Sequence, residues 1–503
     1  MAVFIVRRFF ISTFTLLAAS FIVYVGTVLS GDPLEDLYGI QDQGDAERQQ
    51  AERRRLLQLD TPIPLRYLGW LTGIFRGDFG TNIRGQDVSA LLSTAAAATL
   101  KMVIVATVLA IVFGVMIGII SALRQYSGFD YSLTFAAFLF FSLPIFWVAV
   151  MLKQYAAIEF NNWLRDPTIS TPVILLISVG SAISWMAILG GDRRRRLTTL
   201  GVAFASSAAL LTFFSATRWF ADPGFGTLVV ALLSGISALA ATFLTAGFRH
   251  RPPVTAALTT AGVGFAFYLA STGLLADPTA WLILGLFIVS IGVALGTGAA
   301  LGGLQRRQAM SASVLTAVLV GGVIFIDKML NAYASYASQV RGRPISTVGS
   351  QTPGFRGNFW EVGLDSAGHL LLPTLALLLI SFAVYTRYTR ASMLEVMNQD
   401  YVRTARAKGL TERTVVMRHG FRNALIPVTT LMAFDFGAVI GGAVITERVF
   451  GWQGMGSLFI TGLNDVDPAP VMAFFIVAGG SIVVFNMIAD IAYAYLDPRI
   501  RLS

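Results

Sequence analysis

The chain has 503 residues, of which 55% are hydrophobic and only 13% are charged. Soluble domains carry about 25% charged residues, so this composition indicates a membrane protein. The net charge of +9 comes from basic residues in short connectors between apolar runs. That pattern is typical of cytoplasmic loops that face anionic lipid, and it argues against nucleic-acid binding. The absence of cysteine excludes disulfides and thiolate metal sites.

Residues 1–30 are predicted to form the first membrane span. Arg7 and Arg8 precede an apolar run that continues to about Leu29. The run is longer than the core of a signal peptide, and no convincing cleavage site follows it. We therefore expect this segment to cross the membrane with the N-terminus in the cytoplasm.

Residues 31–93 form the longest polar segment of the chain. The stretch from Glu47 to Arg55 is dense in charge and predicts a surface helix. Tyr, Trp and Phe recur between Leu59 and Asn82, which favours a compact unit over a structureless loop. We expect a small extracytoplasmic domain here.

Residues 94–160 contain two further predicted spans, joined by a short cytoplasmic turn. The first runs from Thr94 to Leu123 and the second from Tyr131 to about Tyr155. A Gly-x-x-x-Gly pair in the first, at residues 114 and 118, allows close approach of another helix. Pro144 is expected to kink the second span.

Residues 161–345 form a long and strongly apolar segment without a catalytic constellation. Six candidate spans can be drawn in it, at 172–190, 197–217, 225–247, 253–275, 279–303 and 309–327. Basic connectors at 192–196, 249–251 and 305–308 alternate with acidic or neutral ones at 221–224 and 276–279. Because basic loops stay in the cytoplasm, the alternation predicts three transmembrane hairpins that leave and return on the external side.

Residues 346–503 contain the last three predicted spans, at about 370–386, 427–445 and 471–495. Arg387 and Arg390 mark a cytoplasmic end after the first of these spans, and Arg499 and Arg501 predict a cytoplasmic C-terminus. Asp435 lies in apolar surroundings within the second span. An intramembrane carboxylate is costly and by default suggests function. Asp435 either faces the translocation pathway or pairs with a basic side chain, and the sequence leaves both open.

A basic segment, 391–426, lies between two of these spans and predicts a helix, a glycine turn and a second helix. Ala405 and Ala407 favour helix, and Gly409 is a natural stop. Thr411 can cap a second short helix. A polar helical bend at the cytoplasmic face has the geometry of a docking element.

The stretch YVRTARAKGL, Tyr401 to Leu410, resembles the EAA loop of ABC-importer permeases, and most closely that of the dipeptide, oligopeptide and nickel importers. The family's Glu-Ala-Ala-x-x-x-Gly core falls on Arg403, Thr404, Ala405 and Gly409, so only the second Ala and the Gly are kept. Further stretches resemble the same family: LDTPIPLRYLGW, RGDFGTN, SLPIFW, TPGF, HLLLPT and LDPRIRL. The family pattern is broken by the apolar segment 161–345, which therefore reads as an insert.

The resemblance implies an all-α polytopic membrane protein with the type I importer permease core. That core has about six transmembrane helices, to which the insert adds about six more. In this family the loop fits a groove on a separate ATPase subunit. The coupling residues implied are Tyr401, Arg403, Thr404, Ala405, Ala407, Lys408 and Gly409. We interpret the insert as accessory helices that contact lipid or another membrane protein.

The function implied is that of a B-type permease subunit in the plasma membrane, which imports di- or oligopeptides by alternating access. The implied partners are a second homologous permease, two ATPase subunits, an extracytoplasmic peptide-binding protein and membrane lipid. The chain lacks the G-x-x-x-x-G-K-[ST] phosphate loop, so we expect no cofactor and no enzymatic activity, with ATP bound by the partners. Nickel or another small solute is the alternative cargo. An ion-driven secondary transporter is a weaker alternative, because its two halves would need matched features.

Overall fold

The computed structural model describes residues 2–496, without the side chains of 2–5, 433–434, 436–442 and 489–496. Ten helices in the described part are long and apolar enough to cross a membrane, and a bent pair adds an eleventh if it is one span. The all-α polytopic fold predicted from the sequence is therefore confirmed. Arg499 and Arg501, which predict the position of the C-terminus, lie outside the described residues.

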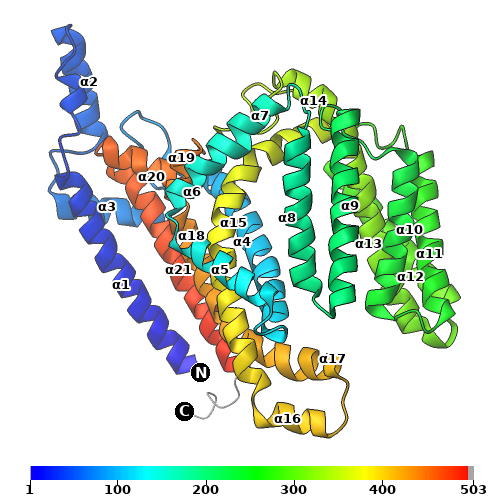
Figure 1. Cartoon of the computed structure of the whole chain (residues 1–503). Coiled ribbons are helices and arrows are strands. Elements are labelled where there is room, and N and C mark those ends of the chain that lie inside the picture. Colours follow the sequence, from blue (N-terminus) through cyan, green and yellow to red (C-terminus); the bar gives the residue numbers. More distant parts are fainter. Residues whose placement is uncertain (1, 497–503) are drawn as a thin grey trace.

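The core is built from five long helices (Figure 1). They are α1 (Ala2–Leu29), α4 (Val88–Leu123), α15 (Phe359–Met397), α18 (Arg422–Gly442) and α21 (Pro468–Leu496). Helix α15 packs along α4, and α21 packs between α1 and α18. Helix α18 has 21 residues and so covers about 30 Å, the thickness of the hydrocarbon layer.

The contact between α4 and α15 depends on the predicted glycine pair. A Cβ atom added at Gly118 would lie 2.8 Å from the Thr386 carbonyl oxygen, and one at Gly114 would lie 2.6 Å from Cβ of Tyr385. Neither separation is possible for a real side chain. The two backbones therefore approach as closely as they do because both positions are glycine.

The predicted third span is broken rather than kinked. Helix α5 (Gly128–Ser142) ends before Leu143, and α6 (Ile145–Met151) begins after Pro144 at an angle of 103°. Leu143 has the extended backbone that a following proline imposes, with φ −82° and ψ 131°. The second arm continues through η2 (Leu152–Glu159) into α7 (Phe160–Trp163).

The insert consists of six long helices that match the six predicted spans to within a few residues at each end. They are α8 (Thr171–Leu189), α9 (Arg193–Thr217), α10 (Gly226–Thr245), α11 (Arg251–Ala270), α12 (Ala280–Leu301) and α13 (Arg306–Asn331). Helices α8 and α9 form a pair, while α10 to α13 form a four-helix bundle with an alanine-rich centre. All three basic connectors lie at the same end of the molecule as α16 (Figure 1).

Hydrogen bonds join the insert to the core at both ends. At the end near α14 (Tyr333–Gln339), the Trp360 indole donates to the Leu275 carbonyl at 2.8 Å. At the opposite end, the Arg413 guanidinium donates to the Leu244 carbonyl at 2.9 Å, and that of Arg124 donates to the Ile188 carbonyl. The insert is thus attached directly to the core.

A buried carboxylate, which the sequence did not single out, fastens the insert's own helices together. Asp327 near the end of α13 is fully buried. It accepts hydrogen bonds from the Tyr268 hydroxyl at 2.8 Å, the Asn331 amide at 3.0 Å and the Phe225 backbone N–H at 3.2 Å. Three donors from three segments thus satisfy the carboxyl oxygens of Asp327, so its role here is structural.

The polar segment after α1 contains α2 (Gln43–Leu56) and α3 (Ile63–Ile74). Tyr67 of α3 packs against Tyr24 of α1 and Met472 of α21. Farther along, Asp467, in the loop before α21, accepts the Ile83 N–H at 2.7 Å. The segment is therefore folded against the core helices rather than extended.

We expect Gly118→Val to lower the thermal unfolding midpoint of the purified protein, because overpacking typically costs about 1–3 kcal/mol. Gly235→Val in α10 is the matched control, since no atom lies within 4 Å of its added Cβ and the change in helix propensity is the same. Equal midpoints for the two variants would contradict the close packing of α4 on α15.

A second prediction concerns pH. Burial raises the pKa of Asp467 to about 6 from its ordinary value of 3.8. The folded state therefore holds a proton at Asp467 that the unfolded state releases, so the contribution of Asp467 to stability is greatest below about pH 4 and falls as the pH rises from about 4 to about 6. The loss is at most about 3 kcal/mol.

Asp467→Asn should flatten this dependence in thermal unfolding measured between pH 4 and pH 7. Asp465→Asn, at a more exposed neighbour, should retain most of it, because burial raises the pKa of Asp467 more than repulsion from Asp465 does. Parallel pH profiles for the wild type and Asp467→Asn would show that Asp467 does not titrate in this range.

Candidate coupling elbow

The elbow, residues 398–421, leaves the C-terminal end of α15 as a short helix that ends at a glycine. Helix α16 (Asp400–Ala407) is closed by two backbone hydrogen bonds, from Leu410 N–H to the Ala405 carbonyl at 3.4 Å and from Gly409 N–H to the Arg406 carbonyl at 2.9 Å. Gly409 has a φ of +75°, the left-handed conformation that this type of helix end requires. The bend thus lies at the predicted glycine.

The second arm of the elbow begins at Thr411, as predicted. Its hydroxyl accepts the Thr414 N–H and caps α17 (Glu412–Thr414), which continues through η4 (Val415–Phe421) into α18. Across the turn, Arg406 donates to Glu412 at 2.8 Å, and this hydrogen bond lowers the pKa of the Glu412 carboxyl. Because both side chains are exposed, the pair adds little stability.

Helix α16 has two distinct faces. Val402 and Ala405 are buried against Val415 of the second arm and hold the elbow closed. The other predicted coupling residues are exposed: Tyr401, Arg403, Thr404, Ala407, Lys408 and Gly409. Ala405 therefore shapes the elbow from inside, while the remaining six form a surface available to another protein.

The elbow is held to the long core helices by side-chain contacts. Asn423 of α18 donates to the Tyr401 hydroxyl at 3.1 Å. Gly420 in η4 lies so close to α15 that an added Cβ would come within 2.9 Å of the Met397 sulfur. The elbow is therefore in direct contact with both α15 and α18.

An ion pair near the elbow was missed by the sequence analysis. Arg390 of α15 donates twice to Asp130 of α5, at 2.7 and 2.8 Å, and the Asp130 side chain is almost fully buried. Asp130 also accepts from the Ser121 hydroxyl of α4 and from the Tyr126 N–H. These contacts fix α4, α5 and α15 relative to one another. The available signal was a carboxylate in the first turn of an otherwise apolar helix.

Asp435 lies between α18 and α15, where it accepts a hydrogen bond from the buried Tyr385 hydroxyl at 2.8 Å. Within the described part of the chain, no Lys or Arg forms an ion pair with it. The hydrogen-bond partner of Asp435 is thus the hydroxyl of Tyr385, where the sequence analysis had considered a basic side chain. That Asp435 faces the translocation pathway stays a prediction.

Glu447 is another buried carboxylate to which the sequence analysis gave no role. It lies in α19 (Val444–Val449), fully buried, and accepts from the Thr99 hydroxyl at 2.5 Å and the Ser457 N–H at 3.1 Å. It therefore joins α4 to the start of α20 (Met455–Asn464). The two residues are 348 positions apart, and no local pattern predicts such a contact.

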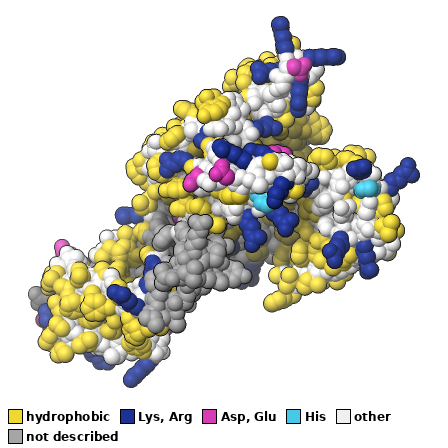
Figure 2. All heavy atoms as spheres, turned by 90° about the horizontal axis from the view of Figure 1, so that it is seen from below, with side chains coloured by type: hydrophobic (Ala, Val, Ile, Leu, Met, Phe, Trp, Pro, Cys, Tyr) yellow, Lys and Arg dark blue, Asp and Glu magenta, His cyan; other side chains and the backbone are white. Residues whose placement is uncertain are grey.

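Most of the charged side chains on the face that carries the elbow are basic. Figure 2 shows Lys and Arg at several places across it, with few Asp and Glu. Long apolar helices, one of which leads through Asn398 and Gln399 into an exposed basic elbow, define the class as a polytopic membrane protein.

The chain belongs to the family of binding-protein-dependent transport system inner membrane components, which residues 259–502 match. It is 36% identical over 237 residues to a protein of Brucella suis named as a peptide permease, covering 46% of this chain and 72% of that relative. Its core is accordingly the ABC type I permease fold. The match begins inside α11 and so includes part of the insert.

Two further relatives have names that specify oligopeptides. The chain is 42% identical over 156 residues to the oligopeptide transport system permease protein OppB of Mycobacterium tuberculosis, covering 31% of this chain. This match spans only about half of that relative, 48%. The oligopeptide transport system permease protein AppB of Bacillus subtilis is 26% identical over an alignment of 507 positions, which covers 100% of both chains.

We expect Gly409→Val to speed amide hydrogen exchange at residues 405–411, because a β-branched residue is strained at a positive φ. Gly409→Asn is the matched control, since asparagine adopts this conformation more readily, and it should stay near the wild type. Equal protection in all three proteins would refute the requirement for glycine at the bend.

Proposed function

We propose that the chain is the permease subunit of an ATP-driven importer of peptides and forms half of its translocation pathway. The observation that carries the proposal is the exposed face of α16 on an elbow fixed to α15 and α18. The peptide cargo is inferred from the names of relatives, which specify oligopeptides, peptides and glutathione. ATP would be bound and hydrolysed by separate subunits.

The mechanism we infer is alternating access driven through the elbow. An ATPase subunit would grip the outward side chains of α16 and move them when it binds ATP. The buried contacts of Ala405 and Val402 would keep α16 rigid, so that the motion passes on rather than bending the elbow. Because α15 has 39 residues and is about 58 Å long, a small displacement at its inner end would reach the opposite face.

The proposed complex contains a second homologous permease, two ATPase subunits and an external peptide-binding protein. The proposed orientation puts the elbow in the cytoplasm, because the basic connectors lie at its end of the molecule. The N-terminus of α1 lies at the same end (Figure 1) and would also be cytoplasmic. Residues 31–93 would then meet the binding protein outside.

The chain offers a clean test because it has no cysteine. We expect cells that lack the chain to lose uptake of labelled oligopeptides and to regain it with the wild type or with Ala407→Cys. A thiol-to-amine cross-linker at Ala407→Cys should then join the chain to an ATPase subunit and stop uptake. The measurements are peptide uptake and the mass of the cross-linked product.

Ala405→Cys is the matched control, because its side chain is buried inside the elbow and should not react. Labelling of Ala407→Cys by an impermeant thiol reagent added outside intact cells would overturn the orientation. Unchanged peptide uptake in cells without the chain would overturn the cargo, even if the ATPase contact is found.

A further inference from the structure

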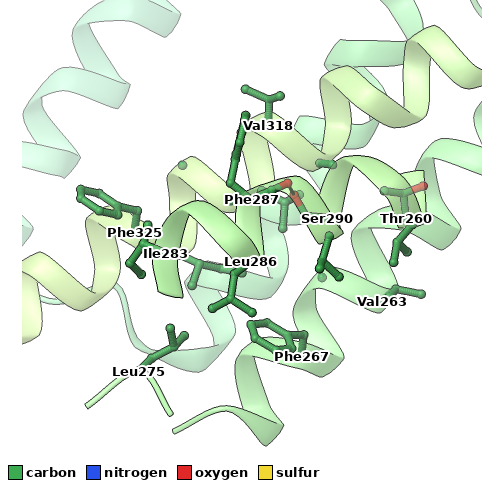
Figure 3. A pocket seen from close by; sticks show the side chains of 18 of the residues that line it. Thr260, Val263, Phe267, Leu275, Ile283, Leu286, Phe287, Ser290, Val318 and Phe325 are labelled. Carbon is green, nitrogen blue, oxygen red and sulfur yellow. Dashed lines mark hydrogen bonds between the residues drawn. The ribbon is translucent and has the colours of Figure 1, made fainter. Parts of the chain in front are cut away.

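A groove with a volume of about 570 Å³ lies in the insert between α11, α12 and α13. Figure 3 shows its walls, with Phe267 of α11 and Leu286 and Phe287 of α12 among the side chains that line it. The α13 wall includes Gly321 and Gly322, around which no atom lies within 4 Å of an added Cβ. The groove exists because these two positions carry no side chain.

The groove occupies one half of the bundle's height. Along α12 it runs from Ile283 to Val293, a separation of ten helical steps or about 15 Å. This equals one leaflet of a hydrocarbon layer about 30 Å thick. On all three helices the lining residues lie toward the end away from the basic connectors.

The chemistry of the lining excludes a polar ligand. Nearly all of the lining side chains are apolar, and none is charged. The Thr260 hydroxyl donates to the Ala256 carbonyl at 2.9 Å, and the Ser290 hydroxyl donates to the Phe287 carbonyl at 2.7 Å. A peptide placed here would lose its hydrogen bonds to water without replacement, which is unfavourable.

The length of the groove favours a hydrocarbon chain over a protein helix. A membrane-spanning helix about 30 Å long would extend beyond a groove of about 15 Å by half its length. A single acyl chain extends through one leaflet and is narrow enough to enter. We propose that the groove binds one acyl chain of a bilayer phospholipid.

The bound chain would lie at the joint between the insert and the core. The groove is lined at one end by Phe325 of α13 and Trp360 of α15. Their rings pack edge to face, with the ring centroids 5.1 Å apart. The Trp360 indole also donates to Leu275, another lining residue. The acyl chain therefore completes the packing of the first turn of α15. This inference depends on the membrane location of the insert and not on the cargo.

The test is native mass spectrometry of the assembled, detergent-purified complex. We expect the wild type to retain one phospholipid per chain, and the double variant Gly321→Leu/Gly322→Leu to reduce the lipid-bound fraction by about tenfold. The matched control is Gly235→Leu/Gly292→Leu, at two helical glycines that are also open around the added Cβ but do not line the groove. It should retain the lipid.

Loss of lipid from both double variants, or from neither, would overturn the proposal, as would a wild type that carries none. A retained mass equal to a free fatty acid, or a polypeptide cross-linked in the groove, would also overturn it. If the Gly321→Leu/Gly322→Leu variant fails to assemble, photolabelling of the wild type decides whether the groove binds an acyl chain. In vesicles of phosphatidylethanolamine and phosphatidylglycerol, a diazirine on the phospholipid acyl chain should label Phe267 and Phe287 more strongly than Phe213 of α9.

Discussion

The close approach of α4 and α15 is the constraint on which the rest of the core depends. Two glycines one turn apart let the backbones meet, and Asp130 of α5 connects the two helices near the elbow, because it pairs with Arg390 of α15 and accepts from Ser121 of α4. With that pair of helices set, α15 can run for 39 residues from the insert to the elbow. The elbow then inherits a defined position, because its second arm packs back onto the end of the same helix.

Much of the fold could be predicted because a membrane span can be recognised from its local sequence. A run of apolar residues and the charge of its connectors are enough to place α8 to α13 to within a few residues. The elbow was predictable for the same reason, since Gly409 and Thr411 act on their immediate neighbours. The sequence did not separate Ala405, which is buried inside the elbow, from the six exposed residues predicted with it.

The rest could not be predicted because it depends on contacts between distant residues. Asp130 and Arg390 are 260 positions apart, and Thr99 and Glu447 are 348 apart. Pro144 predicted a kink, but the 103° turn at this position also depends on what each arm packs against. Asp435 was visible as an unusual carboxylate, yet its Tyr385 partner is on another helix and could not be read from the pattern.

The bonds that join the insert to the core have a further consequence. At Leu244, Leu275 and Ile188, the insert contributes main-chain oxygens at or just beyond the C-terminal ends of helices, where such atoms lack a partner within the helix. The core contributes the side chains that donate hydrogen bonds to these oxygens. Any amino acid at those three positions offers the same oxygen. These three bonds therefore place no demand on the insert's side chains at 188, 244 and 275, whereas replacing Arg124, Arg413 or Trp360 of the core would remove one of them.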